Sequence, residues 1–332
     1  MENKQVLVAK LPDGKLREEN YRFNSGPMPI ASSSQVVVKT HAFAITAGAR
    51  AGLQGSASYA GAAASGIVMS GTGIGEVVAS KDEAFPEGVM VLGPTGWQSY
   101  AALETSAITR IPFDRDPFQY LGPLGINGLT AFFGLFKVGR PAAGDTVMIS
   151  AAAGSVGHFV GQMAKISGCR VVGVCGDDSK CERLTGELRY DAAVNYRDSN
   201  FRERLKSATA NGVDVYFDNT GGMVLGSALF RMNVGGRIAC CGVVSQYDTD
   251  SPEPGPKGIP GLLVNKRIKM QGFLVFDYEK EYESARATIC SWLESGEMIS
   301  ITDEVLGIES APGAFVDLLA GGNVGSRIVR LV

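Results

Sequence analysis

The sequence predicts an α/β protein with a doubly wound parallel sheet in its second half and a β-rich region in its first. Two observations support this fold class. The chain has 332 residues, and about 150 residues per domain is usual, so two domains are expected. The hydrophobic pattern also changes near residue 145, from short β segments punctuated by glycine to alternating strands and helices.

Composition narrows the possible partners. Lys and Arg total 31 and Asp and Glu total 34, a net charge of −3, so neither a nucleic-acid nor a membrane partner is expected. No apolar run reaches the roughly 18 residues of a membrane-spanning helix, and the N-terminal stretch lacks a signal-peptide core. The six cysteines lie in the second half without a Cys-x-x-Cys pair. This pattern indicates reduced thiols in a cytoplasmic protein.

The first 120 residues read as short strands. Branched residues predict a strand at 35–40, and two more are predicted at 66–69 and 75–79, joined at a turn. That turn contains a Gly-x-Gly-x-Gly pattern, but a strand follows it where a phosphate-binding loop would open a helix. We therefore interpret it as turn geometry only.

From residue 145 the chain reads as a βαβ unit. An apolar strand at 145–150 leads through a glycine-rich turn into a helix at 158–167, and a second buried strand follows at 170–174. Further strands are predicted at 192–194, 213–217, 237–241 and 268–273. The alternation predicts a doubly wound parallel sheet. His158, just inside the helix, is expected on the helix surface.

The turn of the βαβ unit is the strongest local signal of function. Gly154 and Gly157 stand where a backbone can approach a pyrophosphate at the positive N-terminus of a helix, with Gly161 one turn further on. The alternative is that these glycines serve only close packing of helix on sheet. After the second strand, Asp177 would suit the ribose hydroxyl of NAD, whereas Lys180 would suit the 2′-phosphate of NADP. The residues alone leave that choice open.

A metal site is not expected. The only histidines are His41 and His158, and no set of zinc ligands stands at a recognisable spacing. Polarisation of a substrate carbonyl must then come from hydrogen bonds. The chain also lacks a Gly-x-Ser-x-Gly elbow and a Walker loop.

Several longer motifs resemble one family. They are similar to the zinc-independent medium-chain dehydrogenases/reductases, and within them to the alkenal double-bond reductase branch, which includes leukotriene 12-hydroxydehydrogenase/prostaglandin reductases and curcumin reductases. The resemblance covers nearly the whole chain from about Tyr59, and its last three segments are specific to the branch. The matching segments are 128–134, 151–157, 161–165, 214–222, 241–247 and 270–278.

The resemblance implies a discontinuous architecture. Residues 1–122 and 296–332 would form a GroES-like catalytic domain, and residues 123–295 a Rossmann dinucleotide-binding domain, with the cofactor in the cleft between them. It implies NADP(H) as cofactor and reduction of the carbon–carbon double bond of an α,β-unsaturated ketone or aldehyde. Hydride would pass to the β-carbon, and the developing enolate would be stabilised by hydrogen bonds.

Cofactor-binding residues follow from the resemblance by position. Lys180 is similar to the lysine of the 2′-phosphate site, Tyr196 to an adenine-side tyrosine, and Asn323 to a tail asparagine that reaches the cofactor. Asn219, Cys241 and Ser245 resemble residues along the nicotinamide ribose, and Thr130, Phe273 and Val275 resemble residues of the nicotinamide pocket. The remaining members of the predicted set are Asn127, Gly154, Ser155, Val156, Gly157 and Asp177.

Tyr247 and Tyr59 are the predicted catalytic residues. A phenol with a pKa of about 10 stays protonated at neutral pH and can donate a hydrogen bond to a developing enolate. Tyr247 ends a branch-specific motif that follows a central strand, and Tyr59 stands among small residues of the first domain. The alternative for each is a packing or surface tyrosine.

The chain departs from the family pattern in three places. The family usually reads Asp-Pro-Tyr-Met-Arg-Gly where this chain has Thr-Ala-Gly-Ala-Arg-Ala at 46–51, so a tyrosine near the substrate is lost. Asp177 replaces a small polar residue beside the 2′-phosphate, and Asn127 replaces a proline. The substrate pocket is therefore expected to differ in shape from that of its relatives.

Two other functions remain open at this point. One is an NADPH quinone oxidoreductase of a sister branch, and the other is a non-catalytic cofactor-binding protein that kept the fold. Whatever the function, the open sheet edge at 268–273 predicts a homodimer, because strand addition across a two-fold axis would pair it.

Overall fold

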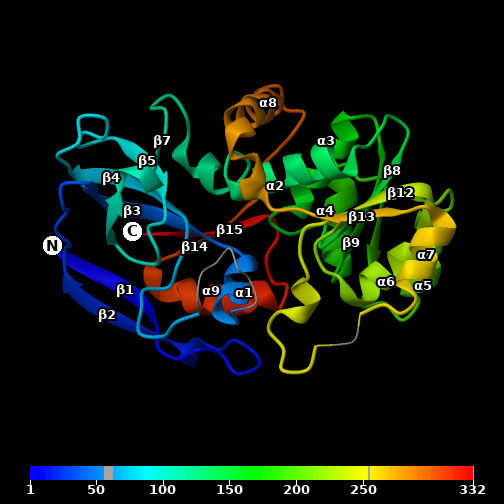
Figure 1. Cartoon of the computed structure of the whole chain (residues 1–332), viewed down its shortest axis with the longest axis horizontal. Helices are drawn as coiled ribbons and strands as arrows, with labels where there is room; N and C mark the ends of the chain where they lie inside the picture. Colours follow the sequence, from blue (N-terminus) through cyan, green and yellow to red (C-terminus); the bar gives the residue numbers. More distant parts are fainter. Residues whose placement is uncertain (56–62, 253–254, 332) are drawn as a thin grey trace. The chain divides into compact units, whose positions relative to one another are not determined.

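The computed structural model describes residues 1–55, 63–252 and 255–331. The chain divides into two compact units (Figure 1). Unit 1 comprises Met1–Gly122 and Thr302–Val332, and unit 2 comprises Pro123–Ile301. Among the described residues, unit 1 has two sheets, a pair formed by β1 (Glu2–Val8) and β2 (Tyr21–Pro27) and a larger sheet, and unit 2 has one.

Unit 2 is built on a six-stranded parallel sheet. Its spatial order is β10-β9-β8-β11-β12-β13, and every neighbouring pair is parallel. The chain reverses its direction of travel between β8 and β11, which makes their carboxyl ends the switch point of the sheet. The predicted doubly wound fold is confirmed. The strands are β8 (Thr146–Ser150), β9 (Arg170–Cys175), β10 (Ala192–Asn195), β11 (Val213–Asp218), β12 (Met232–Cys240) and β13 (Lys269–Gly272).

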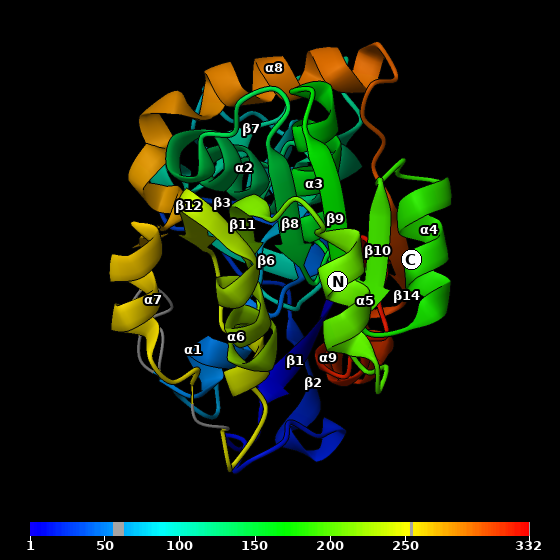
Figure 2. The same ribbon diagram turned by 90° about the vertical axis from the view of Figure 1, so that its right-hand side faces the viewer.

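Helices cover both faces of this sheet (Figure 2). On one face α5 (Phe201–Ala208), α6 (Gly222–Arg231) and α7 (Ile259–Lys266) share a hydrophobic core with alternate residues of the strands. On the other face lie α3 (Gly157–Ile166) and α4 (Asp178–Gly186), and α2 (Ile126–Phe133) packs on α3. Unit 2 also contains a π-helical turn, η5 (Gly134–Gly139), and the helix α8 (Tyr282–Glu294). No helix in the described part of the chain is long and apolar enough to cross a membrane.

Unit 1 is a β-rich domain around the long strand β3 (Gln35–Ile45). Its larger sheet has the order β14-β15-β3-β4-β5-β7, with β6 also paired to β3. Trp97 lies at the centre of its core, stacked on Tyr21 and Phe43 and edge-on to Phe315. The other elements are β1 (Glu2–Val8), β2 (Tyr21–Pro27), α1 (Gly48–Leu53), β4 (Gly73–Ala79), β5 (Met90–Gly93), β6 (Tyr100–Glu104), β7 (Thr109–Arg110), β14 (Thr302–Leu306), α9 (Ala311–Leu319) and β15 (Ser326–Arg330).

One predicted strand is wrong. Residues 66–69 form no strand, and only Val68 makes an isolated bridge, to Leu7. The backbone of Met69 accepts a hydrogen bond from Trp97 N and donates one to Val6 O, both at 2.9 Å. The segment is thus hydrogen-bonded between two other parts of unit 1, and Met69 is buried there while Ile67 is exposed, without a hairpin to the strand that follows.

Two strand ends of unit 2 also differ from expectation. β12 begins at Met232, five residues before the predicted start, and β13 ends at Gly272. Phe273 and Val275 therefore lie beyond the strand, and Val275 opens a short 3-10 helix, η7 (Val275–Glu281).

Candidate dinucleotide-binding site

A buried carboxylate organises the switch point of the sheet. Asp218, the last residue of β11, is 2% exposed. Its Oδ1 accepts hydrogen bonds from the hydroxyl of Tyr216 at 2.8 Å and from that of Ser150, at the end of β8, at 3.2 Å. It also accepts from the backbone amides of Thr220 at 3.0 Å and Gly221 at 2.8 Å. A buried charge with this many donors is stabilised and fixes the backbone around it.

Asn219 continues the same network. Its side-chain amide donates to Ser150 O at 2.8 Å, and its backbone N–H donates to Ser150 Oγ at 2.9 Å. The segment after β12 is joined to it, because Val244 N donates to Asn219 O and Ser245 Oγ donates to Thr220 O at 2.6 Å. Asn219 and Ser245, two predicted ribose-side residues, are thus brought together at the carboxyl ends of β11 and β12.

The glycine turn between β8 and α3 shows which glycines serve packing. A Cβ on Gly157 would stand 2.3 Å from Ala151 O, and one on Gly161 would stand 2.0 Å from the ring of Tyr190. Tyr190 in turn donates to Gly157 O at 2.9 Å. A Cβ on Gly154 would meet only Ala151 O, at 3.2 Å. Gly157 and Gly161 therefore permit close packing, whereas Gly154 keeps an open backbone face at the start of α3. Ser155 and Val156 complete the turn, and no side chain caps the helix among the described residues.

The expected surface position of His158 is wrong. The side chain is fully buried, with Nδ1 2.9 Å from Gly154 O, and its Nε2 has no partner among the described residues. Burial lowers the pKa of the imidazole to about 4, although the carbonyls of Gly154 and Ser155 oppose this. The neutral ring thus donates a hydrogen bond that holds the glycine turn. It is buried because nearly every residue of α3 faces the core.

A cationic cluster lies at the ends of β9 and β10. Asp177 caps α4, accepting from Lys180 N at 2.8 Å and from Ser179 Oγ at 2.7 Å. Burial would raise the pKa of Asp177, but these hydrogen bonds and the charges of Lys180 and Arg197 hold it below its usual value. Lys180 Nζ lies 4.0 Å from Asp177 Oδ2. The carboxylate is therefore engaged as a helix cap and partly neutralised.

Tyr196 and Arg197 complete this cluster. The Arg197 guanidinium lies 5.6 Å from the centroid of the Tyr196 ring. Gly176 is adjacent to both, since a Cβ there would stand 3.3 Å from Tyr196 Cε1 and 3.6 Å from Arg197 Cζ. An aromatic ring and two cations thus surround a turn that has no side chain at Gly176, as a phosphate-bearing ribose beside an adenine would require.

The predicted nicotinamide residues lie around α2. Asn127 is buried in this helix and Thr130 half-buried. One turn on, Gly134 admits the Phe273 ring, which meets Phe217 edge-on at 6.2 Å between centroids. Val275 is buried. The Phe273 side chain is therefore used in packing, which positions the 273–275 backbone beyond the end of β13.

Cys241 and Tyr247 flank the segment after β12. Burial, with smaller contributions from Asp218 and Cys240, raises the pKa of the Cys241 thiol to about 12, so it stays protonated and is not a nucleophile. Tyr247 follows a 3-10 turn, η6 (Val244–Gln246), and is half-buried, with its N–H donating to Val244 O at 3.1 Å.

Two of the predicted site residues, Tyr59 and Asn323, are not among the residues that meet in unit 2. Tyr59 lies outside the described residues. Asn323 belongs to unit 1, where it is buried and its Nδ2 donates to Gly325 O at 2.9 Å. Among the described residues, no group of three or more His, Cys, Asp or Glu side chains could hold a metal ion.

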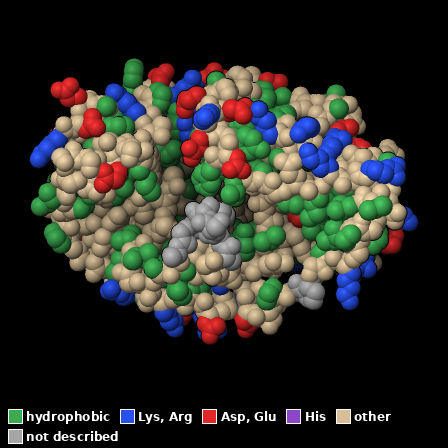
Figure 3. Space-filling model, viewed as in Figure 1, with side chains coloured by type: hydrophobic (Ala, Val, Ile, Leu, Met, Phe, Trp, Pro, Cys, Tyr) green, Lys and Arg blue, Asp and Glu red, His purple; other side chains and the backbone are tan. Residues whose placement is uncertain are grey.

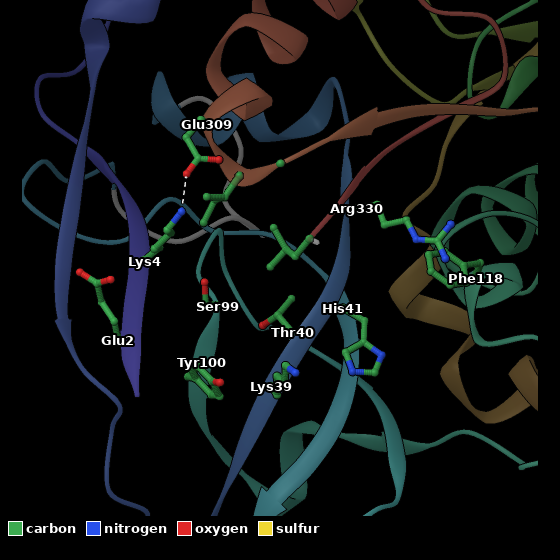
Figure 4. A pocket seen from close by; sticks show the side chains of 13 residues that line it. Glu2, Lys4, Lys39, Thr40, His41, Ser99, Tyr100, Phe118, Glu309 and Arg330 are labelled. Atoms are coloured by element: carbon green, nitrogen blue, oxygen red, sulfur yellow. Dashed lines mark hydrogen bonds and ion pairs between the residues drawn. The ribbon is translucent and has the colours of Figure 1, made fainter.

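Unit 1 contains a cavity of about 680 Å³ of its own (Figure 4). It is lined by residues of β1, β3, β6 and β15, with the Lys4–Glu309 ion pair, 2.8 Å long, at one end. None of the predicted cofactor or catalytic residues lines it.

Sequence reasoning missed Asp218 and Arg197. Asp218 could have been noticed as the carboxylate that follows the apolar run Val215–Phe217 at the end of the strand. Nothing local marks Arg197, because it becomes relevant only when β9 and β10 lie side by side.

The fold and this site define a dinucleotide-binding oxidoreductase with a separate β-rich domain. Residues 155–290 match a family model described as zinc-binding dehydrogenase, and residues 4–111 match one described as the N-terminal domain of oxidoreductase. The chain is 35% identical to a 2-alkenal reductase (NADP(+)-dependent) of Nicotiana tabacum. The alignment covers 99% of this chain and 97% of that protein.

Two further relatives cover the full length. The NADPH-dependent curcumin reductase of Escherichia coli is 33% identical, over 99% of this chain and 97% of that one. The crystal structure of CurA in complex with NADPH from Vibrio vulnificus is 34% identical and superimposes with a TM-score of 0.95 over 99% of both chains. The chain belongs to the medium-chain dehydrogenase/reductase superfamily, in its alkenal double-bond reductase branch, which confirms the resemblance.

Proposed function

We propose that the protein uses NADPH to reduce the carbon–carbon double bond of α,β-unsaturated ketones or aldehydes. The observation that carries this proposal is the arrangement of two features at adjacent strand ends of unit 2. One is the glycine turn before α3, and the other is the Lys180–Tyr196–Arg197 cluster beyond β9 and β10. The tobacco relative is named as an NADP(+)-dependent 2-alkenal reductase and the E. coli relative as an NADPH-dependent curcumin reductase. Both names support the same chemistry.

The residues fit this cofactor. The open backbone at Gly154 and the N-terminus of α3 suit a pyrophosphate. Lys180 and Arg197 suit the additional 2′-phosphate, and the capping bonds of Asp177 direct its carboxylate toward Lys180 N and Ser179. Asn219 and Ser245 would position the nicotinamide ribose, and the backbone at 273–275 would border the ring with Thr130.

The chemistry divides between cofactor and protein. NADPH, when bound, supplies the hydride for the β-carbon of the substrate. The chain's own groups hold the substrate in line and donate hydrogen bonds to the carbonyl oxygen as it gains negative charge. We assign that donation to Tyr247, with Tyr59 as a second candidate, since no metal ligand set is expected.

A substrate panel tests the function. Purified protein is mixed with NADPH and, separately, with enals, enones and quinones, and loss of the reduced nicotinamide absorbance is followed together with product mass. We expect saturated ketone or aldehyde products and full activity after treatment with a chelator. NADPH oxidation by quinones alone would overturn the proposal in favour of a quinone oxidoreductase. Tight NADPH binding without turnover of any enone would indicate a non-catalytic protein.

We also propose that the protein is a cytoplasmic homodimer. All six cysteines are free thiols, as is usual in a reducing compartment. β13 ends the sheet of unit 2 with one unpaired edge, and hydrophobic side chains gather over the α6–α7 side of this unit (Figure 3). Phe230 and Val264 are 68% and 74% exposed there, which supports an interface at this side.

A further inference from the structure

Two thiols lie in contact beneath the turn that carries Lys180. Cys175 ends β9 and Cys181 stands in the first turn of α4. Their sulfur atoms are 3.2 Å apart, and the residues are 3% and 9% exposed. A disulfide has an S–S distance of about 2.05 Å, so the two atoms need to approach by only about 1.2 Å.

The segment between the two cysteines is the turn of the cofactor cluster. It contains Gly176, the Asp177 cap with its bonds to Ser179 and Lys180, and Lys180 itself. A bond between Cys175 and Cys181 would close a small ring around these residues. Since α4 would have to move toward β9, the position of Lys180 would change with the redox state of the pair.

The two sulfurs are chemically distinct. The hydrogen bond from Cys175 lowers the pKa of Cys181, although burial opposes this. The same hydrogen bond, together with burial, raises the pKa of Cys175. Cys181 is also the more exposed of the two residues, at 9% against 3%, so we take it as the partner that an oxidant reaches first, and its thiolate is the reactive nucleophile.

We propose that Cys175 and Cys181 form an oxidative modification site, at which a hydroperoxide converts the pair to a disulfide and weakens NADPH binding. The Cys181 thiolate attacks the peroxide oxygen, breaks the O–O bond and becomes a sulfenic acid, and the leaving oxygen takes up a proton. Cys175 then attacks the sulfenyl sulfur, loses its proton and releases water. With hydrogen peroxide, two thiols are oxidised by two electrons and two waters form.

Thermodynamic linkage makes this coupling reciprocal. If the disulfide weakens NADPH binding by some factor, bound NADPH must disfavour disulfide formation by the same factor. The cofactor would thereby protect the pair from oxidation. This part rests on the proposed cofactor site, whereas disulfide formation itself does not.

Mass spectrometry tests the modification directly. Reduced protein is treated with hydrogen peroxide, and the peptides are mapped without reduction. We expect loss of two hydrogen atoms in a peptide that links Cys175 to Cys181, and no such loss in Cys181→Ser or Cys175→Ala. Cys240→Ser, which alters another thiol of the same unit, is the matched control and should oxidise like the parent. Absence of the link in the folded parent protein would overturn the proposal.

Cofactor binding tests the coupling. The dissociation constant for NADPH should rise at least about tenfold in the oxidised parent and return on reduction, and the peroxide-treated Cys181→Ser variant should bind like its untreated form. A linked pair with unchanged affinity would overturn the coupling. Failure of the reduced protein to bind NADPH at all would instead refute the proposed function, and the mass measurement would still decide whether the disulfide forms.

Discussion

At the residue scale, the Lys180–Tyr196–Arg197 cluster brings together charges from separate segments of the chain. Lys180 stands in α4 and Arg197 follows β10, and the charges of both lower the pKa of Asp177. Asp177 itself is occupied as the cap of α4. The two positive charges would therefore favour an additional phosphate in the proposed cofactor site, in spite of the Asp177 carboxylate.

Removal of the positive charge of Lys180 or Arg197 should raise the Michaelis constant for NADPH more than that for NADH. Lys180→Ala should raise the Michaelis constant for NADPH about 10- to 100-fold, because a charge-assisted hydrogen bond contributes about 1.5–3 kcal/mol. Arg197 is more exposed, so Arg197→Ala should raise it about two- to fivefold. Steady-state kinetics with both cofactors measure this, with Lys206→Ala, on the far part of α5, as control. Equal effects on NADPH and NADH would refute the assignment.

Tyr247→Phe tests the hydrogen-bond donor. Loss of a donor to a developing oxyanion typically lowers turnover about 100- to 1,000-fold, and Tyr59 could share the load, so we expect at least a tenfold decrease. The dissociation constant for NADPH should stay within about twofold of the parent value. Turnover is measured on the best enone of the panel, and Tyr196→Phe serves as a matched tyrosine control on the adenine side. An unchanged turnover number would exclude Tyr247 as the donor.

At the element scale, the strand-turn-helix from β8 to α3 is held by packing on both sides. Gly157 and Gly161 bring the helix against the turn and against Tyr190, and buried His158 ties its first turn to Gly154. These contacts hold the turn rigid at Gly154, where the backbone is not covered by side chains. Such preorganisation lowers the free-energy cost of binding.

Gly157→Ala should destabilise this element. Its Cβ would meet backbone atoms, Ala151 O at 2.3 Å and Ala152 Cα at 2.8 Å, which cannot yield as a flexible side chain would. We expect the free energy of unfolding to fall by about 1–3 kcal/mol in denaturant titrations. Gly186→Ala at the end of α4 is the control, because a Cβ there meets nothing within 4 Å. It should leave stability unchanged or raise it by up to about 1 kcal/mol.

His158 should make stability depend on pH. The unfolded chain binds a proton near pH 6.5, whereas the folded imidazole, with a pKa of about 4, does not. The free energy of unfolding should therefore fall as pH decreases from 6.5 to 4, by at most about 1.4 kcal/mol per unit. Carboxylates with a lowered pKa, such as Asp191 and Asp198, contribute below this window.

Variants of the two histidines isolate this effect. Denaturant titrations between pH 4 and 7 should give a flatter profile for His158→Gln than for the parent. Burial also lowers the pKa of His41, but the side chain is half-exposed, so His41→Gln should flatten the profile less than His158→Gln does. Parallel profiles for the parent and His158→Gln would show that the buried imidazole is not the group responsible.

At the scale of the whole molecule, the open edge of β13 predicts the assembly. Sedimentation at micromolar concentration should give twice the 34.9 kDa chain mass. β13 has only four residues. If two copies of β13 pair across a two-fold axis, Gln271 therefore lies within about two residues, or about 7 Å, of that axis. Gln271→Glu should then place like charges opposite each other and weaken the dimer about tenfold at low salt.

Salt provides the control for this variant. At about 1 M salt the charges are screened over about 3 Å, so the dimer of Gln271→Glu should recover. Gln119→Glu adds the same charge to a residue of unit 1, outside the strand itself, and should sediment like the parent. A monomeric parent, or an unaffected dimer in the variant, would contradict pairing through β13.

Local pattern alone predicts much of this protein. The apolar strands, the glycine turn and the helix from 145 to 175 were predicted within a residue or two, because period and turn chemistry are properties of neighbouring residues. The motifs that mark the reductase branch were equally readable. Residues of the cofactor site and Tyr247 were proposed from such motifs, and their roles remain predictions.

Contacts between distant segments decided the rest. The burial of His158, the bonding of residues 66–69 to two other segments of unit 1, and the use of Phe273 in packing follow from elements that meet only in the folded chain. Asp218 gathers donors from β8, β11 and the next turn, and Arg197 reaches the cofactor cluster because β10 lies beside β9. No periodicity encodes such meetings, since burial and hydrogen-bond partners depend on which strands become neighbours in the sheet.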